Sequence, residues 1–505
     1  MRKRLIVSAA SALSLFLAVP ASASGFQPGA DGVGDPYLPT AGNGGYRVSH
    51  YDIRLKYQPA TDELEGTTTI LATTTENLSR FNLDFVLKVS EVLVNGRPAT
   101  FATSGDQELE ITPARPLPKG TPVTVVVRYK DVPSAATLYD YSAWHRTPDG
   151  GVVSGEPYGS TWWFPNNDHP SNKATYDVSV MVPNGTQVVS NGVLTSATSQ
   201  AGWTRFNWRE NKPQATYLTT LAIGKFDVTQ DTSSKGVPIY NAYSKDLGED
   251  AAAARASVER TGELVDWLSD YFGAYPFSSV GGLVPNIPSS GALETQTRIV
   301  YGPGLFADGS NTSVVVHELA HQWYGDSVSL SRWSDIWLNE GFAEYAQFLW
   351  SEHENEGTAQ ELADYAYARY PADHVFWTVK PGDPGVDHLF AWPVYLRGAM
   401  ALQALRNTVG DETFFRILKG WPTERRYGNA TVQDFQAFAE RLSGRSLADV
   451  FTTWLFTLGK PAVGPVPNAA AAAAATARPS EGALPAEPKS WKKIQDASSV
   501  HADRK

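Results

Sequence analysis

The residues of this chain best suited to chemistry are His317-Glu318-Leu319-Ala320-His321 and Glu340, which lies nineteen positions beyond His321. On a helix, residues four positions apart share a face, so His317 and His321 can bind one metal ion through one ring nitrogen each. Glu340 can supply a third ligand. Zinc prefers a tetrahedral shell of nitrogen, sulfur and carboxylate ligands, and catalytic sites leave the fourth position to water. The spacing therefore predicts a catalytic zinc site, with Glu318 as a spare carboxylate beside the metal.

The element that carries the two histidines has the composition of a buried helix, with apolar neighbours at Val314, Val315, Val316, Leu319, Ala320 and Trp323. Two imidazoles and a carboxylate buried there are costly without partners, and a metal ion provides the partner. The alternative is a chance match in which two histidines simply belong to the core. The downstream glutamate argues against chance.

Glu340 lies in a second segment with a helical pattern, whose apolar residues Leu338, Phe342, Tyr345 and Leu349 share one side. Glu344 follows Glu340 by four residues and is therefore on the same face. We expect Glu344 to orient a ligand histidine through its second ring nitrogen, with a plain surface glutamate as the alternative.

The interval of eighteen residues between His321 and Glu340 resembles that of the aminopeptidase N family of zinc exopeptidases, the gluzincin aminopeptidases. The family also has a Gly-Ala-Met-Glu-Asn loop, which Gly291-Ala292-Leu293-Glu294-Thr295 resembles with two substitutions. The resemblance implies that Glu294, on a substrate-binding loop with Gly291 and Ala292, binds the free α-amino group of a peptide. Without the resemblance, Glu294 would be taken as a solvated loop residue.

Four more segments resemble the same family. Glu156-Pro157, the run from Phe164 to Pro170 and Lys173-Ala174-Thr175-Tyr176 match its Glu-Pro, Phe-Pro-x-x-Asp-Glu-Pro and Lys-Ala-Thr-Phe segments, with His169 in place of a glutamate. This implies that Glu156 is a second carboxylate at the amine site, whereas a Pro-bounded turn between strands is the alternative. Tyr395-Leu396-Arg397-Gly398 is similar to the family's Tyr-x-Lys-Gly, which implies that the Tyr395 hydroxyl stabilises an oxyanion. By itself, Tyr395 would be a core aromatic.

Composition limits the classes of function. A chain of 505 residues with 42% apolar residues and 15 Trp can fill two or three sizeable cores. Its net charge of -11 argues against a nucleic-acid-binding surface. There is no cysteine, so a zinc site must use histidine and carboxylate ligands.

The first residues have the features of a secretory signal peptide. Arg2-Lys3-Arg4 precedes an apolar run from Leu5 to Val19, and Ala21-Ser22-Ala23 is a small-residue cleavage site. An uncleaved anchor is the alternative, but the run is shorter than the roughly 20 residues of a membrane span. We expect residues 1–23 to be removed from a secreted, extracellular enzyme with no membrane segment.

The rest of the chain predicts a multi-domain α+β fold, with an all-β domain followed by a helix-rich, thermolysin-like catalytic domain. After a loose Gly/Pro-rich segment (24–45), alternating residues such as Ile53, Leu55 and Tyr57 indicate strands over 46–228. Helical patterns follow over 229–460. Residues 461–505 contain Pro, Gly and an alanine run, which predicts a disordered tail. Larger members of the family have a long helical domain there, so a more open active site is expected.

These observations predict a monomeric zinc aminopeptidase with one Zn²⁺ per chain, acting on peptides with a free N-terminus. Zinc on His317, His321 and Glu340 would lower the pKa of its water from that of bulk water towards about 7. Glu318 would act as general base and then as general acid, and Tyr395 would stabilise the oxyanion. A thermolysin-type zinc endopeptidase is the alternative enzyme, and it needs no amine anchor. A non-catalytic binding protein on this fold is the third possibility.

Overall fold

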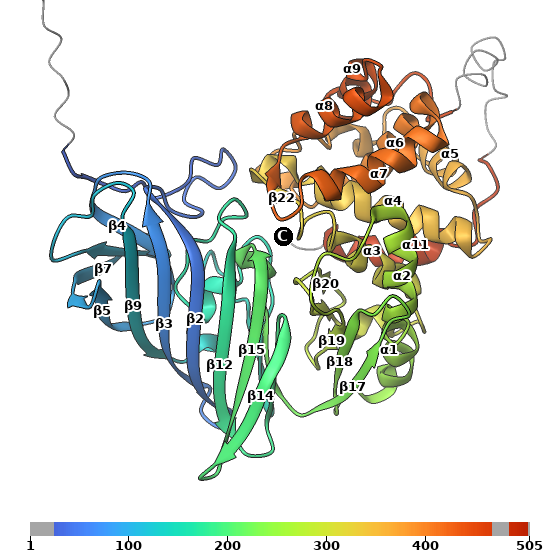
Figure 1. The fold of residues 1–505 in the computed structure, drawn as a ribbon. Coiled ribbons are helices and arrows are strands. Elements are labelled where there is room, and N and C mark those ends of the chain that lie inside the picture. Colours follow the sequence, from blue (N-terminus) through green and yellow to red (C-terminus); the bar gives the residue numbers. More distant parts are fainter. Residues whose placement is uncertain (1–24, 467–483, 503–505) are drawn as a thin grey trace, which may run out of the picture.

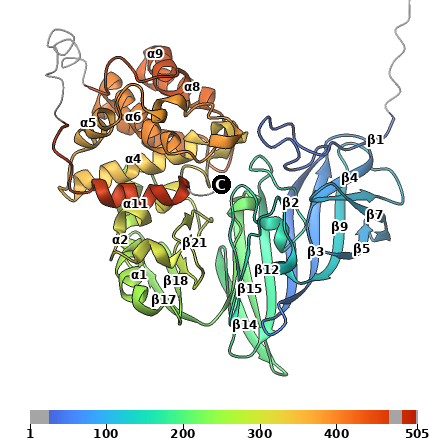
Figure 2. The ribbon, with the colours of Figure 1, turned by 180° about the vertical axis from the view of Figure 1, so that it is seen from behind.

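The computed structural model describes residues 25–466 and 484–502, which form two domains side by side (Figure 1). A domain of β-sheets comes first in the chain, and a helix-rich domain follows. The view from behind shows the same division, with long strands on one side and helices on the other (Figure 2). The predicted fold class, an all-β domain followed by a helix-rich catalytic domain, is confirmed.

The β-domain is built on an eight-stranded sheet with the order β14-β15-β12-β2-β3-β9-β5-β6. Only the β12–β2 pair in this sheet is parallel, with Val178 opposite Ile53. Buried residues alternate with more exposed ones along β2, as the sequence pattern predicted, so one face of the sheet covers the core. The strands are β2 (Tyr46–Gln58), β3 (Glu63–Thr74), β5 (Val89–Val94), β6 (Arg97–Pro98), β9 (Pro122–Asp131), β12 (Ala174–Pro183), β14 (Val193–Gln200) and β15 (Trp203–Gln214).

Two four-stranded sheets complete this domain. One has the order β1-β4-β8-β7 and the other β10-β11-β16-β13. Their strands are β1 (Gln27–Pro28), β4 (Leu78–Asp84), β7 (Thr100–Ser104), β8 (Glu108–Thr112), β10 (Trp144–Thr147), β11 (Gly150–Val153), β13 (Gln187–Ser190) and β16 (Leu221–Gly224). Apolar residues from all three sheets form one core, in which Trp144, Trp163 and Trp208 are buried.

The catalytic domain opens with a five-stranded sheet of order β17-β18-β19-β21-β20. Its strands are β17 (Phe226–Thr232), β18 (Pro238–Ser244), β19 (Gly282–Val284), β20 (Ala292–Leu293) and β21 (Ile299–Tyr301). Ala242, Leu283 and Val300 belong to the core of the β-domain, so this sheet joins the two domains. Strand β17 begins at Phe226, close to residue 228, where the sequence predicts the end of the all-β domain.

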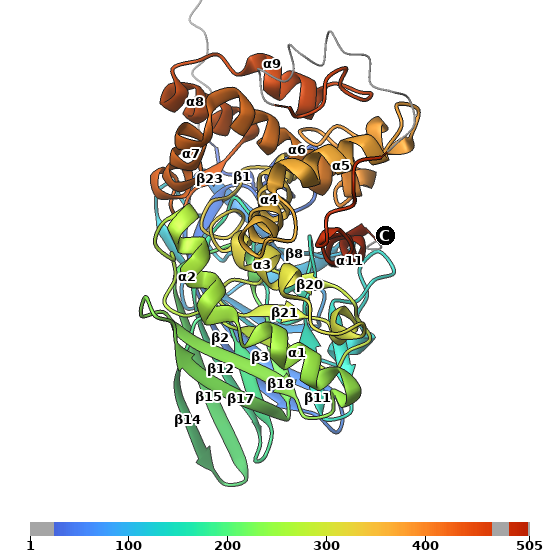
Figure 3. The same ribbon diagram turned by 90° about the vertical axis from the view of Figure 1, so that its right-hand side faces the viewer.

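Helices form the remainder of the catalytic domain; α1 lies beside β18, and α4 to α9 lie above the sheet (Figure 3). They are α1 (Ala251–Val258), α2 (Thr261–Phe272), α3 (Thr312–His321), α4 (Trp337–His353), α5 (Ala359–Arg369), α6 (Trp392–Val409), α7 (Asp411–Glu424), α8 (Val432–Ser443), α9 (Ala448–Phe451) and α11 (Trp491–Ala502). The helix α4 packs between α3 and α6, and every residue from Trp337 to Ser351 is buried. Among the described residues, no helix combines the length and the apolar composition that crossing a membrane requires.

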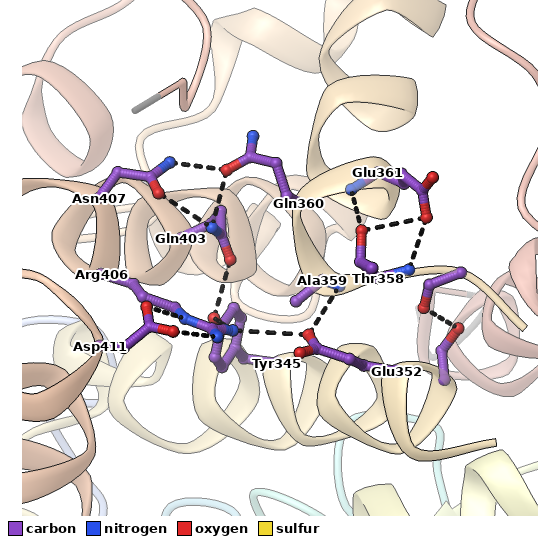
Figure 4. Close-up of polar contacts among 12 residues, drawn as sticks. Tyr345, Glu352, Thr358, Ala359, Gln360, Glu361, Gln403, Arg406, Asn407 and Asp411 are labelled. Atoms are coloured by element: carbon purple, nitrogen blue, oxygen red, sulfur yellow. Dashed lines mark hydrogen bonds and ion pairs between the residues drawn. The ribbon is translucent and has the colours of Figure 1, made fainter. Parts of the chain in front are cut away.

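A polar network holds four of these helices together (Figure 4). The Tyr345 hydroxyl on α4 donates to Gln403 Oε1 on α6 at 2.8 Å, and Gln403 Nε2 donates to Gln360 on α5 at 2.9 Å. Arg406 on α6 binds Asp411 on α7 through two nitrogens at 2.9 and 3.0 Å. These bonds fix α4 and α6, which carry Glu340 and Tyr395, relative to each other.

The segment 24–45 was expected to be loose, but its described residues are held by both domains. Asp35 accepts hydrogen bonds from the backbone of Trp333 at 2.7 Å and lies 3.1 Å from His169 Nε2. Tyr37 donates to Asp383 at 2.6 Å, and Asn43 donates to Asp84 at 3.0 Å. The prediction from composition was wrong because the partners of these polar side chains lie far away in the sequence.

The prediction of a disordered tail is wrong for residues 484–502. Trp491 and Ile494 of α11 are buried in the core of the catalytic domain, and the Trp491 ring lies 4.9 Å from that of Tyr365. Ser490 shares a hydrogen bond of 2.6 Å with Ser351 at the end of α4. The apolar anchors of α11 offset its ordering entropy. The alanine run and the predicted signal peptide lie outside the described residues.

Candidate active site

The helix α3 positions the two histidines. It begins at a good capping residue, since Asn311 Oδ1 accepts from the backbone N–H groups of Ser313 and Val314 at 3.0 and 3.3 Å. His317 and His321 then lie one turn apart on the buried helix, with ring centroids separated by 5.0 Å. The helical spacing predicted from the sequence is therefore present.

Glu340, in the first turn of α4, completes a group of three ligand side chains with these histidines. Its Oε2 lies 3.4 Å from the Nε2 of His317 and 3.4 Å from the Nε2 of His321. A tetrahedral ion with bonds of about 2.0–2.1 Å separates its ligand atoms by about 3.4 Å, which is the spacing seen here. The buried donor set thus fits zinc, and the predicted ligands His317, His321 and Glu340 come together.

The outer nitrogens of both histidines have partners that can hold the rings. His321 Nδ1 is 3.1 Å from the Tyr324 carbonyl, which leaves the Nε2 lone pair for a metal. His317 Nδ1 is 2.9 Å from the Gln347 amide and 3.8 Å from Glu344 Oε2, and Gln347 donates to Glu344 at 2.7 Å. Glu344 is buried and is not a surface glutamate. Gln347 lies between it and the ring, so the two residues orient His317 together.

The buried side chains around the predicted metal site carry more negative than positive charge. Burial would raise the pKa of Glu340, but His321 and His317 hold it well below its usual range. Burial would lower the pKa of His321, yet Glu340, Glu294 and Glu318 raise it. Burial also raises the pKa of Glu294, and Glu340 and Glu318 add to it against the opposing charge of His321. The site therefore favours added positive charge, such as a divalent cation or a substrate ammonium.

The two carboxylates assigned to the amine site from the resemblance meet at the ligand glutamate. One oxygen from each of Glu156, Glu294 and Glu340 lies within 4.8 Å of the others. Glu294 follows β20, which includes Ala292, and Gln322 at the end of α3 donates to the Glu294 carbonyl at 3.0 Å. Strand β20 lies on the side of the catalytic domain that faces the β-domain (Figure 1). Residues far apart in sequence and from both domains thus form one acidic cluster.

The other predicted site residues lie on α3, on α6 and next to β20. Glu318 is fully buried between the two histidines on α3. Tyr395, near the start of α6, is buried with its ring 6.0 Å from the His317 ring and nearly parallel to it. Gly291 directly precedes β20. His169 binds Asp35 and so joins the N-terminal segment to the β-domain.

Three residues that support the site were not predicted from the sequence. Gln347 touches His317, Gln322 holds the Glu294 loop, and Asn339 donates to the Tyr217 hydroxyl at 3.4 Å beside Glu340. A signal for Gln347 was present, since it lies seven residues after Glu340 on the same helix face. No local pattern marks Tyr217, because it comes from the β-domain.

Comparison with known families agrees with this geometry. The Peptidase M1 N-terminal domain matches residues 47–218, and the Peptidase family M1 domain matches residues 256–454. The first match covers the β-domain and the second covers the helices with the zinc ligands. The chain belongs to the M1 family of zinc metallopeptidases, and the resemblance found from the sequence motifs is confirmed.

Individual relatives are 25–27% identical to this chain over the aligned residues. Glutamyl aminopeptidase from Rattus norvegicus is 27% identical over 463 residues, which is 82% of this chain and 47% of that protein. Aminopeptidase M1-C from Oryza sativa subsp. japonica is 25% identical and covers 64% of this chain and 38% of its own length. The chain spans about half the length, or less, of these curated relatives.

Solved structures match over nearly their whole length. An M1 zinc metallopeptidase from Deinococcus radiodurans is 28% identical, with a TM-score of 0.77, and the match covers 86% of this chain and 99% of that one. A mutant of that enzyme bound to a Tyr-Ser-Ala substrate is 29% identical, with a TM-score of 0.76 and coverage of 86% and 100%. The two-domain arrangement is therefore shared with an experimentally determined M1 enzyme.

Proposed function

We propose that this protein is a zinc aminopeptidase that removes the first residue of peptides. One observation carries the proposal: Glu156 of the β-domain and Glu294 of the catalytic domain meet within 4.8 Å of the ligand Glu340. A peptidase that cuts internally needs no such group of carboxylates. A chain-end enzyme does, because it must hold the free ammonium of its substrate at a set distance from the metal.

Substrate binding follows from the acidic cluster. Glu294 is buried and Glu156 is half-buried, so an ammonium placed between them is largely removed from water. Charge-assisted hydrogen bonds are strong in such surroundings. With the ammonium held there, the first peptide bond lies beside His317, His321 and Glu340, and bonds further along the chain lie too far away.

Zinc, when bound, would acidify a water molecule and polarise the carbonyl of the scissile bond. Glu318 takes the proton of the attacking water and delivers it to the leaving amine. The Tyr395 hydroxyl donates a hydrogen bond to the carbonyl oxygen as its charge develops. Buried Glu344 and Gln347 hold His317 in the orientation that its ligand role requires.

Relatives support a chain-end activity but leave the first residue open. The similar curated proteins include glutamyl aminopeptidases from Rattus norvegicus and Bos taurus. A mutant of the Deinococcus radiodurans enzyme is bound to Tyr-Ser-Ala, and two-domain M1 zinc metallopeptidase mutants are bound to L-arginine or L-tryptophan. Single amino acids and a peptide with a free N-terminus are the ligands expected of a site that holds an ammonium.

Export and a monomeric state are also part of the proposal. The basic start, the apolar run and Ala21-Ser22-Ala23 support secretion with cleavage after Ala23. Mass measurement of the protein from culture medium, together with light scattering, checks both. Protein that stays in the cells with residues 1–23 attached would contradict export, and a dimer mass would contradict the monomer.

Product analysis tests the activity. A decapeptide with a free N-terminus and its N-acetylated twin are each incubated with the zinc-loaded enzyme, with and without a chelator. We expect a ladder of products shortened from the N-terminus, no cleavage of the acetylated twin, and no activity with the chelator. Internal fragments from both peptides would instead establish the thermolysin-type endopeptidase.

A further inference from the structure

A strained hairpin lies beside the amine site. Leu138 and Tyr141 exchange backbone hydrogen bonds of 2.9 and 3.0 Å, so Tyr139 and Asp140 form a two-residue turn. Both central residues have left-handed backbone, with φ of 52° and 60°. Turns of this kind normally use Asn-Gly or Asp-Gly, because a bulky side chain is disfavoured there. The needs of folding alone do not explain a tyrosine at this position.

The hairpin presents two aromatic rings to solvent, although its base is anchored. Leu138 is buried, whereas Tyr139 is 57% exposed and Tyr141 is 46% exposed. Exposed aromatic side chains on an ordered turn offer apolar area at small entropic cost, which suits binding.

Contacts place both rings against the segment that carries Glu156. The Tyr141 hydroxyl donates to the Ser154 carbonyl at 3.4 Å, and a side chain at Gly155 would meet that hydroxyl at 3.2 Å. The Tyr139 ring lies 5.9 Å from the ring of Tyr158. Ser154 and Tyr158 are two residues before and after Glu156. The two tyrosines therefore flank the residue assigned to the substrate ammonium.

We propose that Tyr139 and Tyr141 form an aromatic wall that receives the side chain of the substrate's first residue and selects large apolar and aromatic side chains. This inference rests on the proposed function, since Glu156 and Glu294 must hold the ammonium for the first side chain to lie near the wall. The same carboxylates disfavour an acidic first residue, because it would lie close to like charges. Peptides that begin with Tyr, Phe or Leu are thus the substrate class.

The test compares kcat/KM for fluorogenic substrates that carry a single Tyr, Phe, Leu, Ala, Arg or Glu residue. The variants are Tyr139→Asn, Tyr141→Ala, the double variant, and Tyr141→Phe, which keeps the ring. Phe101→Ala, which removes an exposed aromatic from β7, is the matched control. Tyr139→Asn suits the left-handed turn, so it removes a ring without loss of folding, which a melting curve verifies.

We expect the native enzyme to prefer Tyr, Phe and Leu over Ala and Glu by about tenfold or more. The double variant should lose about tenfold or more in kcat/KM for aromatic substrates and less than about twofold for Ala. Tyr141→Phe and Phe101→Ala should retain the native preference. A native preference for Glu, Arg or Ala would overturn the proposal, and so would an equal loss on all substrates or an unchanged preference in a folded double variant. If the native enzyme cleaves none of these substrates but cuts acetylated peptides, the proposed function itself fails.

Discussion

Burial follows different patterns in the two domains. Along β2, buried Tyr51, Ile53, Leu55 and Tyr57 alternate with more exposed residues, so only one face of the strand is in the core. Along α4, every residue from Trp337 to Ser351 is buried, polar ones included. Hydropathy alone could predict the strand, because apolar and polar residues alternate in a sheet that has one face in the core and one in solvent. A helix that is buried on all sides shows no such alternation. Its function can be recognised only from the types and spacing of its polar residues.

The difference also concerns what stabilises each region. The β-domain has a core of apolar and aromatic side chains, and it also buries polar residues such as Asp84, Asn167 and Asp168. Helices α3 and α4 bury His317, Glu318, His321, Glu340 and Glu344 beside one another. Buried polar groups are costly unless all have partners, and metal and substrate complete the set here. Variants that change catalysis without stability, or stability without catalysis, therefore test this difference between the two domains.

The largest effect should come from the catalytic glutamate. Glu318→Gln should lower kcat by about 10² to 10⁴-fold while zinc stays at one per chain, because in the proposed mechanism Glu318 transfers protons and does not bind the metal. Glu340→Ala should instead lose the metal, since two histidines alone are an incomplete site. Metal analysis after dialysis, together with kinetics, separates the two. Zinc loss in Glu318→Gln, or full zinc in Glu340→Ala, would contradict the assignment.

The anchor of the C-terminal helix should have the largest effect on stability. Trp491→Ala should lower the free energy of unfolding by about 3–5 kcal/mol, because the ring is buried against Tyr365. Denaturant titration measures the change. Lys492→Ala, at an exposed position on the same helix, is the control and should change little. Equal stability of both variants would show that α11 does not dock.

Gln347 tests the polar layer behind the metal. Gln347→Ala should weaken zinc binding by about 10–100-fold, because the amide and Glu344 hold the outer nitrogen of His317. Competition with a chelating dye gives the affinity. Thr73→Ala, on the exposed face of β3, is a control from the β-domain. Unchanged zinc affinity in Gln347→Ala would mean that Glu344 alone orients the ring.

Asp35 should give the smallest effect, and it should depend on pH. Burial would raise its pKa, but hydrogen bonds from His169 and three backbone N–H groups lower it below the usual 3.8. A lowered pKa stabilises the fold above pH 3.8, and this contribution is lost as the pH falls through the folded-state value. Asp35→Asn should cost about 1–3 kcal/mol at pH 7 and less near pH 3.

Urea titrations at both pH values measure that cost. Asp373→Asn, at an exposed position, is the control. A cost for Asp35→Asn that is equal at both pH values would show that the ionised carboxylate contributes nothing.

The zinc ligands could be predicted from sequence because their chemistry is local. His317 and His321 are one helical turn apart, and Glu340 follows at a family-specific interval. The meeting of Glu156 with Glu294 has no local signal, and only the resemblance to a family pointed to it. Long-range pairs such as Asp35 with Trp333 were missed for the same reason.

The C-terminal helix was missed because composition was averaged over too long a segment. Alanine and proline dominate the residues before it, yet Trp491 and Ile494 are three positions apart, which is the spacing of one helix face. A search for short apolar stripes within the tail would have found it.

The claim that a carboxylate cluster sets the point of cleavage is tested most directly on Glu294. The measurement is kcat/KM for one peptide with a free N-terminus and for its acetylated form, in the native enzyme and in Glu294→Ala. We predict that the variant loses about 2–5 kcal/mol of transition-state stabilisation on the free peptide only, because the acetylated form makes no ion pair. Comparable native rates on both peptides, or an equal loss on both in the variant, would contradict the account.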